Sequence, residues 1–477
     1  MQRDRSSKSV RRDLEVEYTG RPVSGWGGLV SVVRYFDAIG LRGWLRRALP
    51  DGRRSPNLIP VDDMVLSLYA TVLTGGRRFF HVERIRHDEV VRGVLGIRRI
   101  ASMMSLTRYF GGFVQSQVNH VADVLGSLVM RGVQSVPEGE VLDLDSTVFE
   151  RYGQQEGSVK GHNPRKHGRP SHHPLLAMLA SAKVVVHAWL RSGNAGTARG
   201  VQAFLAEVLA RLPARITLRA VRADSGFFER EFLDELDERK LGYAIAVRIN
   251  RRVRREIVGI HEWKAFGPGL EAGEVPYQTY KWKQPRRLVV VREEISRRPE
   301  ARGRRLFDLP DYTFHGVITS LNDPPEEVWR FYNGRADCEN RLKELKVDYG
   351  ADGFCLQSFF GTEAVFRLIC VLFNLVAQFK HQVLLDDAPQ LGTLRHSTFV
   401  IGAILGSKGR TPVLRLGLRG RWRERFATLL ARIATLSTVT PFRQPETLPH
   451  LEAPRPWQPR PRKRPKSPLP HLQFAFN

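Results

Sequence analysis

The chain has 477 residues, of which 75 are Lys or Arg and 49 are Asp or Glu, so its formal net charge is +26 although 42% of the residues are hydrophobic. A folded protein with so large a basic excess is expected to bind a polyanion, and nucleic acid fits better than a membrane surface. The polar N-terminus, the charges within every long apolar run and the three Cys argue against a secreted, membrane-spanning or zinc-stabilised protein. We therefore expect a cytoplasmic protein that works on the nucleoid.

Residues 1–135 are predicted to form a helical DNA-binding and dimerisation region. Apolar residues recur at helical spacing in 27–49, 62–75 and 118–133. Between them, residues 81–110 resemble two short helices around a turn, followed by a Ser/Thr-led helix that carries Arg108. This arrangement suits a helix-turn-helix that reads DNA, so Arg108 is a predicted DNA contact.

An α/β core is predicted to follow, because from Val141 the apolar period changes to two and strands then alternate with helices. The strands are expected at 141–149, 175–190 (two strands), 216–224 and 243–249, and the helices at 201–212 and 227–240. We divide the remaining chain into four parts. They are the first part of the core at 136–249, a β-rich insertion at 250–325, the second part of the core at 326–390, with the helix of Glu339 and a buried helix at 361–382, and a basic helical C-terminal region with a Pro- and Arg-rich tail at 391–477.

The C-terminal region carries half of the net charge. Residues 395–477 hold 16 Lys and Arg against three Glu, and their last part is rich in Pro. An extended basic tail that clamps the DNA backbone fits this composition, and a solubilising tail is the alternative.

Acidic residues stand at the ends of two predicted core strands. Asp143 and Asp145 share one face of the first strand, and Asp224 ends another. Strand-end carboxylates commonly hold catalytic metal, although they also serve as ordinary helix caps. Asp145, at the end of the first strand, and Asp224 form with Glu339 an Asp–Asp–Glu set that could coordinate two divalent ions about 4 Å apart.

Glu339 belongs to residues 326–350, which are predicted to form one helix because no Pro follows Pro325. On a helical projection, five polar residues lie within about 60° of the first of them: Tyr332, Arg335, Glu339, Lys343 and Lys346. The other acids of the segment, Asp337, Glu344 and Asp348, project to the far side. One carboxylate among cations and a tyrosine suits a site that holds metal and handles phosphate, and a solvated helix face is the alternative. The projection also makes Lys343 a predicted phosphate contact.

The spacing Tyr332-x2-Arg335-x3-Glu339-x6-Lys346 resembles the Y-R-E-K signature of bacterial insertion-sequence transposases of the DDE type. Residues 143–180, 189–200 and 222–228 are further similar to insertion-sequence family thirteen-eighty, within the IS4-like superfamily. The resemblance implies a ribonuclease-H-like catalytic core interrupted by the β-rich insertion. It also implies that Asp145, Asp224 and Glu339 are the metal-binding catalytic triad, with Asp143 as second choice for the first place.

The resemblance implies a function as well. The protein would bind the terminal inverted repeats of its element as a homodimer, cleave the double-stranded DNA ends and join the 3′-OH ends to target DNA in a cut-and-paste reaction. Two Mg²⁺ ions would serve each active site, with Mn²⁺ as a substitute. Tyr332, Arg335 and Lys346 would contact phosphates. Relatives with this signature cut through a hairpin and flip a base onto a tryptophan, for which Trp263, Trp282 and Trp329 are the candidates.

A basic loop at 160–173 is predicted to lie on DNA. Its histidines fit no standard zinc spacing, and neighbouring cations would repel a metal ion. Arg191 and Asn194 are expected to serve the same surface. The predicted DNA contacts of the loop are Lys160, Arg165, Lys166, Arg169 and His172.

Two other functions are compatible with the sequence. One is a ribonuclease-H-like, structure-specific DNA nuclease without strand transfer, and the other is a domesticated DNA-binding protein without catalysis. The Y-R-E-K face favours the transposase over the nuclease. Three acidic residues at one site are costly to keep together, which argues against a retired enzyme.

Overall fold

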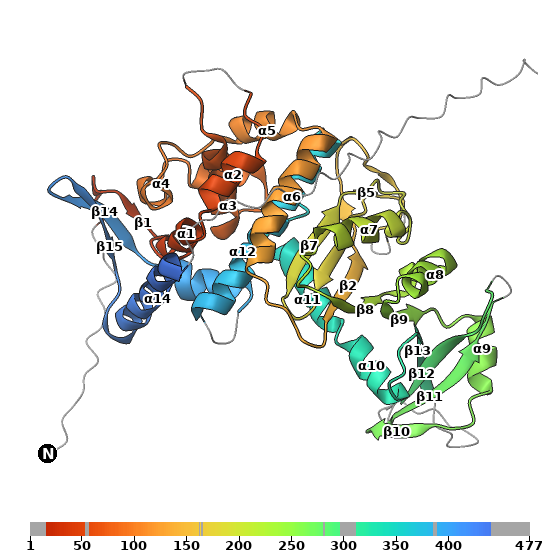
Figure 1. The fold of residues 1–477 in the computed structure, drawn as a ribbon. Coiled ribbons are helices and arrows are strands. Elements are labelled where there is room, and N and C mark those ends of the chain that lie inside the picture. The colour runs from red at the N-terminus through yellow and green to blue at the C-terminus, as the bar shows by residue number, and fades with distance from the viewer. Residues whose placement is uncertain are drawn as a thin grey trace, which may run out of the picture. The chain divides into compact units, whose positions relative to one another are not determined.

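The computed structural model describes residues 16–439 apart from 53–56, 162, 164–165, 280–281, 296–311 and 385–388 (Figure 1). The predicted Pro- and Arg-rich tail therefore lies outside the described residues.

The N-terminal region is helical, as predicted. Its elements are α1 Leu29–Ala38, α2 Leu41–Ala48, α3 Val61–Leu73, the 3₁₀ helix η1 Phe79–Arg84, α4 Glu89–Leu95, α5 Met103–Gly111 and α6 Gln115–Arg131. Gly40 separates α1 from α2 because it takes a left-handed conformation at φ 68°. Ser102 begins α5 by accepting a hydrogen bond from the amide of Ser105, which confirms the Ser-led helix that carries Arg108.

The largest sheet among the described residues has nine strands, in the order β10-β11-β12-β13-β9-β8-β2-β6-β7. The strands that come from the first part of the core, residues 136–249, are β2 Glu140–Ser146, β6 Leu175–Leu179, β7 Val184–Trp189, β8 Leu218–Ala223 and β9 Gly242–Val247. Strand β2 runs parallel to β8 and β8 parallel to β9, while β6 is antiparallel to both β2 and β7. Helices α7 Val201–Arg211 and α8 Arg230–Glu238 connect these strands, so the predicted alternation is confirmed.

The segment predicted as a β-rich insertion extends this same sheet. Its elements are α9 Arg251–Val258, β10 Lys264–Gly267, β11 Leu270–Tyr277, β12 Arg286–Glu294 and β13 Tyr312–Thr319. Strand β13 pairs antiparallel with β9, with Gly316 opposite Val247. The ladder of backbone hydrogen bonds therefore continues from the core into the segment 250–325.

Helix α12 (Phe359–Phe379) confirms the predicted buried helix and packs against both α6 and β7 (Figure 1). With its π-helical extension η4 (Lys380–Leu384), it is long and apolar enough to cross a membrane, but 89% of its most apolar window is buried inside the protein. Its polar side chains are paired there: Arg367 with Glu363, and Asn374 with the backbone of Val185.

The C-terminal region was predicted to be helical ahead of its Pro- and Arg-rich tail, and this is wrong for residues 403–416. They form a hairpin of β14 (Ala403–Lys408) and β15 (Thr411–Leu416), which turns at Gly409 and pairs with β1 (Val23–Ser24). The partner strand comes from the other end of the chain, so local sequence does not reveal it. Helical structure does flank the hairpin, in α13 Leu391–Leu394, the π-helix η5 Arg395–Phe399 and α14 Gly420–Val439. A third, small sheet contains β3 Phe149–Glu150, β4 Val159–Lys160 and β5 Pro170–His172.

The single helix predicted for residues 326–350 is two helices. Helix α10 (Pro325–Asn333) ends at Gly334, and α11 (Ala336–Val347) begins after Arg335. Both residues at the break keep right-handed helical angles, and the amide of Arg335 bonds to the Tyr332 carbonyl, three residues back. The backbone therefore forms a tighter turn at the break, with a hydrogen bond three residues back, and keeps its right-handed helical sense.

Candidate active site

Asp145 lies near the carboxyl end of β2 and is almost fully buried, with 7% of its surface exposed. Its Oδ1 accepts a hydrogen bond from the amide of Ser146 at 2.7 Å. Burial is the main reason that the pKa of Asp145 is raised to about 7. The negative charges of Asp224 and Glu339 add to this rise, and the positive charge of Arg335 opposes it.

Asp224 follows β8 directly, next to the end of β2, because Leu144 pairs with Ala223 in the parallel register. Its Oδ1 accepts the amide of Gly226 at 2.9 Å and thereby caps the 3₁₀ turn η2 (Ser225–Phe227). The carboxylate is half-buried, and its charge acts on Asp145, Tyr332 and Arg335. The two strand-end aspartates therefore belong to one site.

Arg335 connects the strand end to the helix. Its guanidinium contacts Oδ2 of Asp145 at 3.0 Å and Oε1 of Glu339 at 2.6 Å, while its own side chain is 6% exposed and that of Glu339 is 62% exposed. Burial alone would lower the pKa of Arg335, but the charges of Asp145, Tyr332 and Asp224 outweigh burial and raise it. One permanently charged guanidinium thus contacts two members of the predicted triad, and the charge of the third, Asp224, acts on it.

Tyr332 lies beside this cluster in the last turn of α10. Its ring stacks on Trp329 at a centroid distance of 5.9 Å, and burial is the main reason that its pKa is raised. Of the three candidate tryptophans, Trp329 is therefore the one beside the site. Trp282 is buried among Tyr277 and Phe228, and Trp263 is covered by Arg292.

The two lysines of α11 differ in their surroundings. Lys346 is half-buried, and its Nζ donates to Thr147 Oγ1 at 3.3 Å and to the Val148 carbonyl at 2.9 Å, immediately after β2. Lys343 is exposed one turn beyond Glu339, and its side chain makes no ion pair with the residues that the structure describes. Both face solvent at least in part, as a DNA contact requires.

Asp143, the second choice for the first carboxylate, has a different partner. It is 1% exposed, and both of its oxygens accept hydrogen bonds from Arg222, at 2.7 and 2.8 Å. Burial raises the pKa of Asp143 and Arg222 opposes that rise. Sequence reasoning missed Arg222, because a single Arg within a strand carries no signal of a cross-strand partner.

The basic loop surrounds an exposed aromatic residue. Lys166 pairs with Glu150 and bonds to the Tyr152 hydroxyl, and Arg169 lies over the Tyr152 ring at 4.6 Å. Lys160 and Asn194 are exposed, whereas Arg165 lies outside the described residues.

His172 and Arg191 were predicted on the DNA-facing surface, and the structure corrects their position. His172 is 0% exposed, bonds to Arg151 and the Glu156 carbonyl, and burial is the main reason that its pKa is lowered to about 4. Arg191 donates to the carbonyls of His173, Gly196, Thr197 and Arg199. Both buried side chains bond to backbone carbonyls of the loops, and the local sequence gives no sign of these partners.

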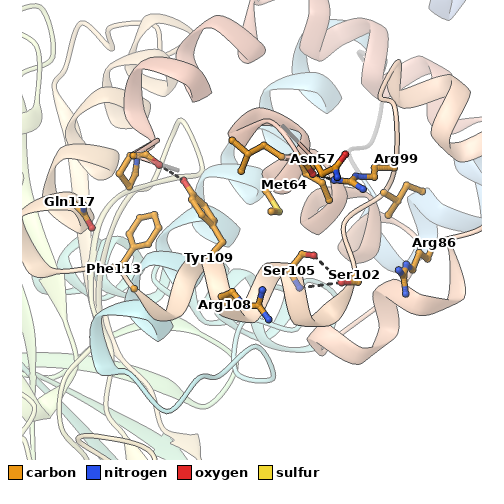
Figure 2. Close-up of a pocket in the computed structure, with 16 residues that line it drawn as sticks. Asn57, Met64, Arg86, Arg99, Ser102, Ser105, Arg108, Tyr109, Phe113 and Gln117 are labelled. Carbon is orange, nitrogen blue, oxygen red and sulfur yellow. Dashed lines mark hydrogen bonds between the residues drawn. The ribbon is translucent and has the colours of Figure 1, made fainter. Parts of the chain in front are cut away.

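Arg108 lies in a pocket of about 570 Å³ within the N-terminal helices (Figure 2). Arg86 and Arg99 also line it, and no acidic side chain does so among the described residues. Tyr109, Phe113 and Met64 supply an apolar wall, and Ser102 and Ser105 line the pocket at the start of α5. The sequence predicted Arg108 as a DNA contact but did not single out Arg86 and Arg99, which line the same pocket.

The acidic side chains have the chemistry of a divalent-metal site, because carboxylate oxygens are the ligands that such ions prefer. A cation beside Asp145 would favour its ionised form and so oppose the rise in pKa that burial and the neighbouring carboxylates cause. As arranged in the described residues, no three Asp, Glu, His or Cys side chains lie close enough to hold an ion. Arg335 separates Asp145 from Glu339, so a metal ion would require this guanidinium to move.

Carboxylates at the ends of parallel strands, faced by cations from a helix, are typical of metal-dependent enzymes that act on phosphate esters. The sequence matches, over residues 6–438, the family described as "Transposase DDE domain group 1". The chain belongs to this family and is a transposase, an enzyme that acts on DNA, in a family that uses divalent metal ions.

No curated protein sequence matches the chain. Among solved structures, the chain is similar to a transposase chain in the structure titled "Cryo-EM structure of piggyBac transposase synaptic complex with hairpin DNA". The TM-score is 0.44 and the identity 11%, over 89% of this chain and 86% of that one.

Proposed function

We propose that this transposase binds the terminal inverted repeats of its own insertion sequence, cleaves the DNA ends and joins the resulting 3′-OH ends to target DNA. One observation carries the proposal: two ion pairs join Asp145, Arg335 and Glu339, and the charge of Asp224 acts on the same cluster. In the strand order β7-β6-β2-β8-β9, β2 is antiparallel to β6 and parallel to β8, and β8 is parallel to β9. This arrangement supports a ribonuclease-H-like core.

Asp145, Asp224 and Glu339 would hold the divalent ions, which we assign as two Mg²⁺ ions that Mn²⁺ can replace. Bound there, the ions would activate the attacking oxygen and stabilise the leaving 3′-oxygen. Arg335 would release the two carboxylates and turn its planar guanidinium to a DNA phosphate, which accepts the same pair of hydrogen bonds. Tyr332, Lys343 and Lys346 would contact neighbouring phosphates, and Trp329 is our candidate for stacking an unpaired base if cleavage proceeds through a hairpin.

DNA would also contact surfaces away from this cluster. Lys166 and Arg169, which contact Tyr152, would supply one surface together with the exposed Lys160 and Asn194, and the Arg86–Arg99–Arg108 pocket would supply another. Arg residues suit this purpose because each guanidinium can grip a phosphate with two hydrogen bonds. We propose further that two copies act together on the element ends, in the cytoplasm on the nucleoid.

The assignment is tested with full-length protein and DNA that carries the inverted repeats flanking its own gene. Glu339→Gln and Asp145→Asn should bind this DNA as tightly as the wild type but lose nicking in Mg²⁺ by at least about 10³-fold, since each removes a metal ligand. A Glu339→Gln protein that nicks at the wild-type rate would show that the site is wrongly assigned. Offering a pre-cleaved 3′-OH end and a target plasmid separates a transposase, which joins them, from a nuclease, which does not.

A further inference from the structure

Asp143 and Arg222 stand opposite each other in the parallel register of β2 and β8. Each lies two residues before a proposed metal ligand, Asp145 and Asp224, and therefore on the same face of the sheet. Arg222 grips Asp143 with two hydrogen bonds, Nε to Oδ1 at 2.7 Å and Nη2 to Oδ2 at 2.8 Å. The side chains are 7% and 2% exposed, so this ion pair is inside the protein.

The remaining nitrogen of Arg222 reaches the helix that precedes the site. Nη1 donates to the Phe331 carbonyl oxygen at 2.7 Å, in the last turn of α10. In an uninterrupted α-helix that carbonyl would accept the amide of Arg335, four residues later. The amide of Arg335 bonds to the Tyr332 carbonyl instead. A side chain that takes a carbonyl out of the helical ladder is an established cause of a break, and this one coincides with the end of α10.

Gly334 gives Arg222 the space for this contact. A Cβ atom at Gly334 would overlap Nη1 of Arg222, although the backbone angles of this residue suit any amino acid. The guanidinium also lies 5.2 Å from the Phe331 ring. The Arg222 guanidinium thus joins the sheet to the Phe331 carbonyl and lies against Gly334. This junction directly precedes Arg335, which lies one helical turn before Glu339.

We propose that the Asp143–Arg222 pair is a positioning clamp for the catalytic helix. It fixes where α10 ends and α11 begins, and thereby sets Arg335 and Glu339 opposite Asp145, although neither clamp residue contacts DNA or metal. The inference rests on the proposed assignment of Asp145, Asp224 and Glu339. Arg222 can do this because its fork binds a carboxylate and a carbonyl at the same time, which a lysine ammonium cannot do in the same geometry.

The test compares Arg222→Lys and Gly334→Ala with a matched control, Arg367→Lys. Arg367 is equally buried, with 6% of its side chain exposed, and is paired with Glu363 inside α12, where neither residue contacts the proposed active site. Three quantities are measured on full-length protein: Mn²⁺ affinity by titration, hydrogen exchange of the amides from Phe331 to Glu339, and the single-turnover rate of end cleavage. The melting temperature of each variant shows that it is folded under the conditions used.

Arg222→Lys and Gly334→Ala should weaken Mn²⁺ binding and slow cleavage by about tenfold or more, as residues that orient metal ligands do. Exchange should become faster between Phe331 and Glu339. Arg367→Lys should leave all three quantities within about twofold of the wild type, even if its melting temperature falls as much as that of Arg222→Lys or Gly334→Ala. Gly334→Ala keeps the test decisive should Arg222→Lys fail to fold, because it leaves the Asp143–Arg222 ion pair chemically intact.

Glu339→Gln, measured in the same series, separates the two proposals. If it loses Mn²⁺ affinity while the folded clamp variants keep the wild-type values, the clamp is overturned and the site assignment stands. If Glu339→Gln itself binds Mn²⁺ like the wild type, the site assignment fails, and the clamp proposal fails with it.

Discussion

At the scale of single residues, the site is governed by how an excess of negative charge is balanced. Asp145 is buried, Asp224 and Glu339 act on it from two other elements, and Arg335 is the cation that contacts two of the three. Only one of these acids is removed from water to a large extent, so the charge of Asp145 is the most sensitive to its surroundings.

This balance predicts how stability depends on pH. The pKa of Asp145 is raised from 3.8 to about 7, so the folded protein holds this proton more tightly than the unfolded chain does. The resulting stability is fully present below about pH 4 and is lost as the pH rises through about 7, with a size of up to about 4 kcal/mol. In EDTA, Asp145→Asn should lack this loss and should melt at a higher temperature than the wild type at pH 8. Parallel melting-temperature profiles of the two proteins from pH 4.5 to 8 would contradict the raised pKa.

The chemical types at the site could be predicted from the sequence, but their pairing could not. Alternation along a strand placed Asp143 and Asp145 on one face, and the helical projection chose Glu339 among several acids. Choosing between Asp143 and Asp145 from physics required Arg222, whose partner lies on another strand. His172 and Arg191 were predicted to lie on DNA because they belong to the basic loop and its surface. This is wrong, because both side chains are buried and bond to loop carbonyls.

At the scale of elements, most helices and strands of the core follow from local apolar periodicity, whereas the exceptions depend on distant contacts. The break between α10 and α11 involves Arg222 of β8, and the β14–β15 hairpin pairs with β1 from the other end of the chain. Neither partner is visible in a window of ten or twenty residues.

The contact between Gly28, directly before α1, and η5 gives a prediction about packing. A Cβ atom at Gly28 would overlap the carbonyl oxygen of Thr398, whereas at Gly43, exposed within α2, nothing lies within 4 Å of it. Gly28→Ala should therefore lower the melting temperature by several degrees, since the backbone of η5 must shift. Gly43→Ala should raise stability by up to about 1 kcal/mol, because alanine is the better helix former. Chemical denaturation of both variants tests the opposite signs, and equal effects would show that α1 does not pack closely on residues 398–399.

At the scale of the whole molecule, basic charge is distributed over separate regions. The proposed active site, the loop around Tyr152 and the Arg86–Arg99–Arg108 pocket lie in the part of the chain that the structure describes. Residues 440–477 add seven Lys and Arg against two Glu. Since each phosphate contact releases counterions, these regions should contribute separately to the salt dependence of DNA binding.

Removing residues 440–477 tests this view of the tail. The described residues up to 439 belong to one compact unit and the family match ends at residue 438, so the shortened protein should keep the wild-type melting temperature. Its DNA affinity should fall, and the slope of log K against log salt should become less steep by about one for each phosphate that the tail neutralises in the full-length protein. Changing the seven Lys and Arg of the tail to Gln should reproduce the deletion, because charge is the proposed cause. Arg108→Ala, in the same titration, should reduce the slope by about one. An unchanged slope after the deletion would assign the tail to solubility, the role that its composition also allows.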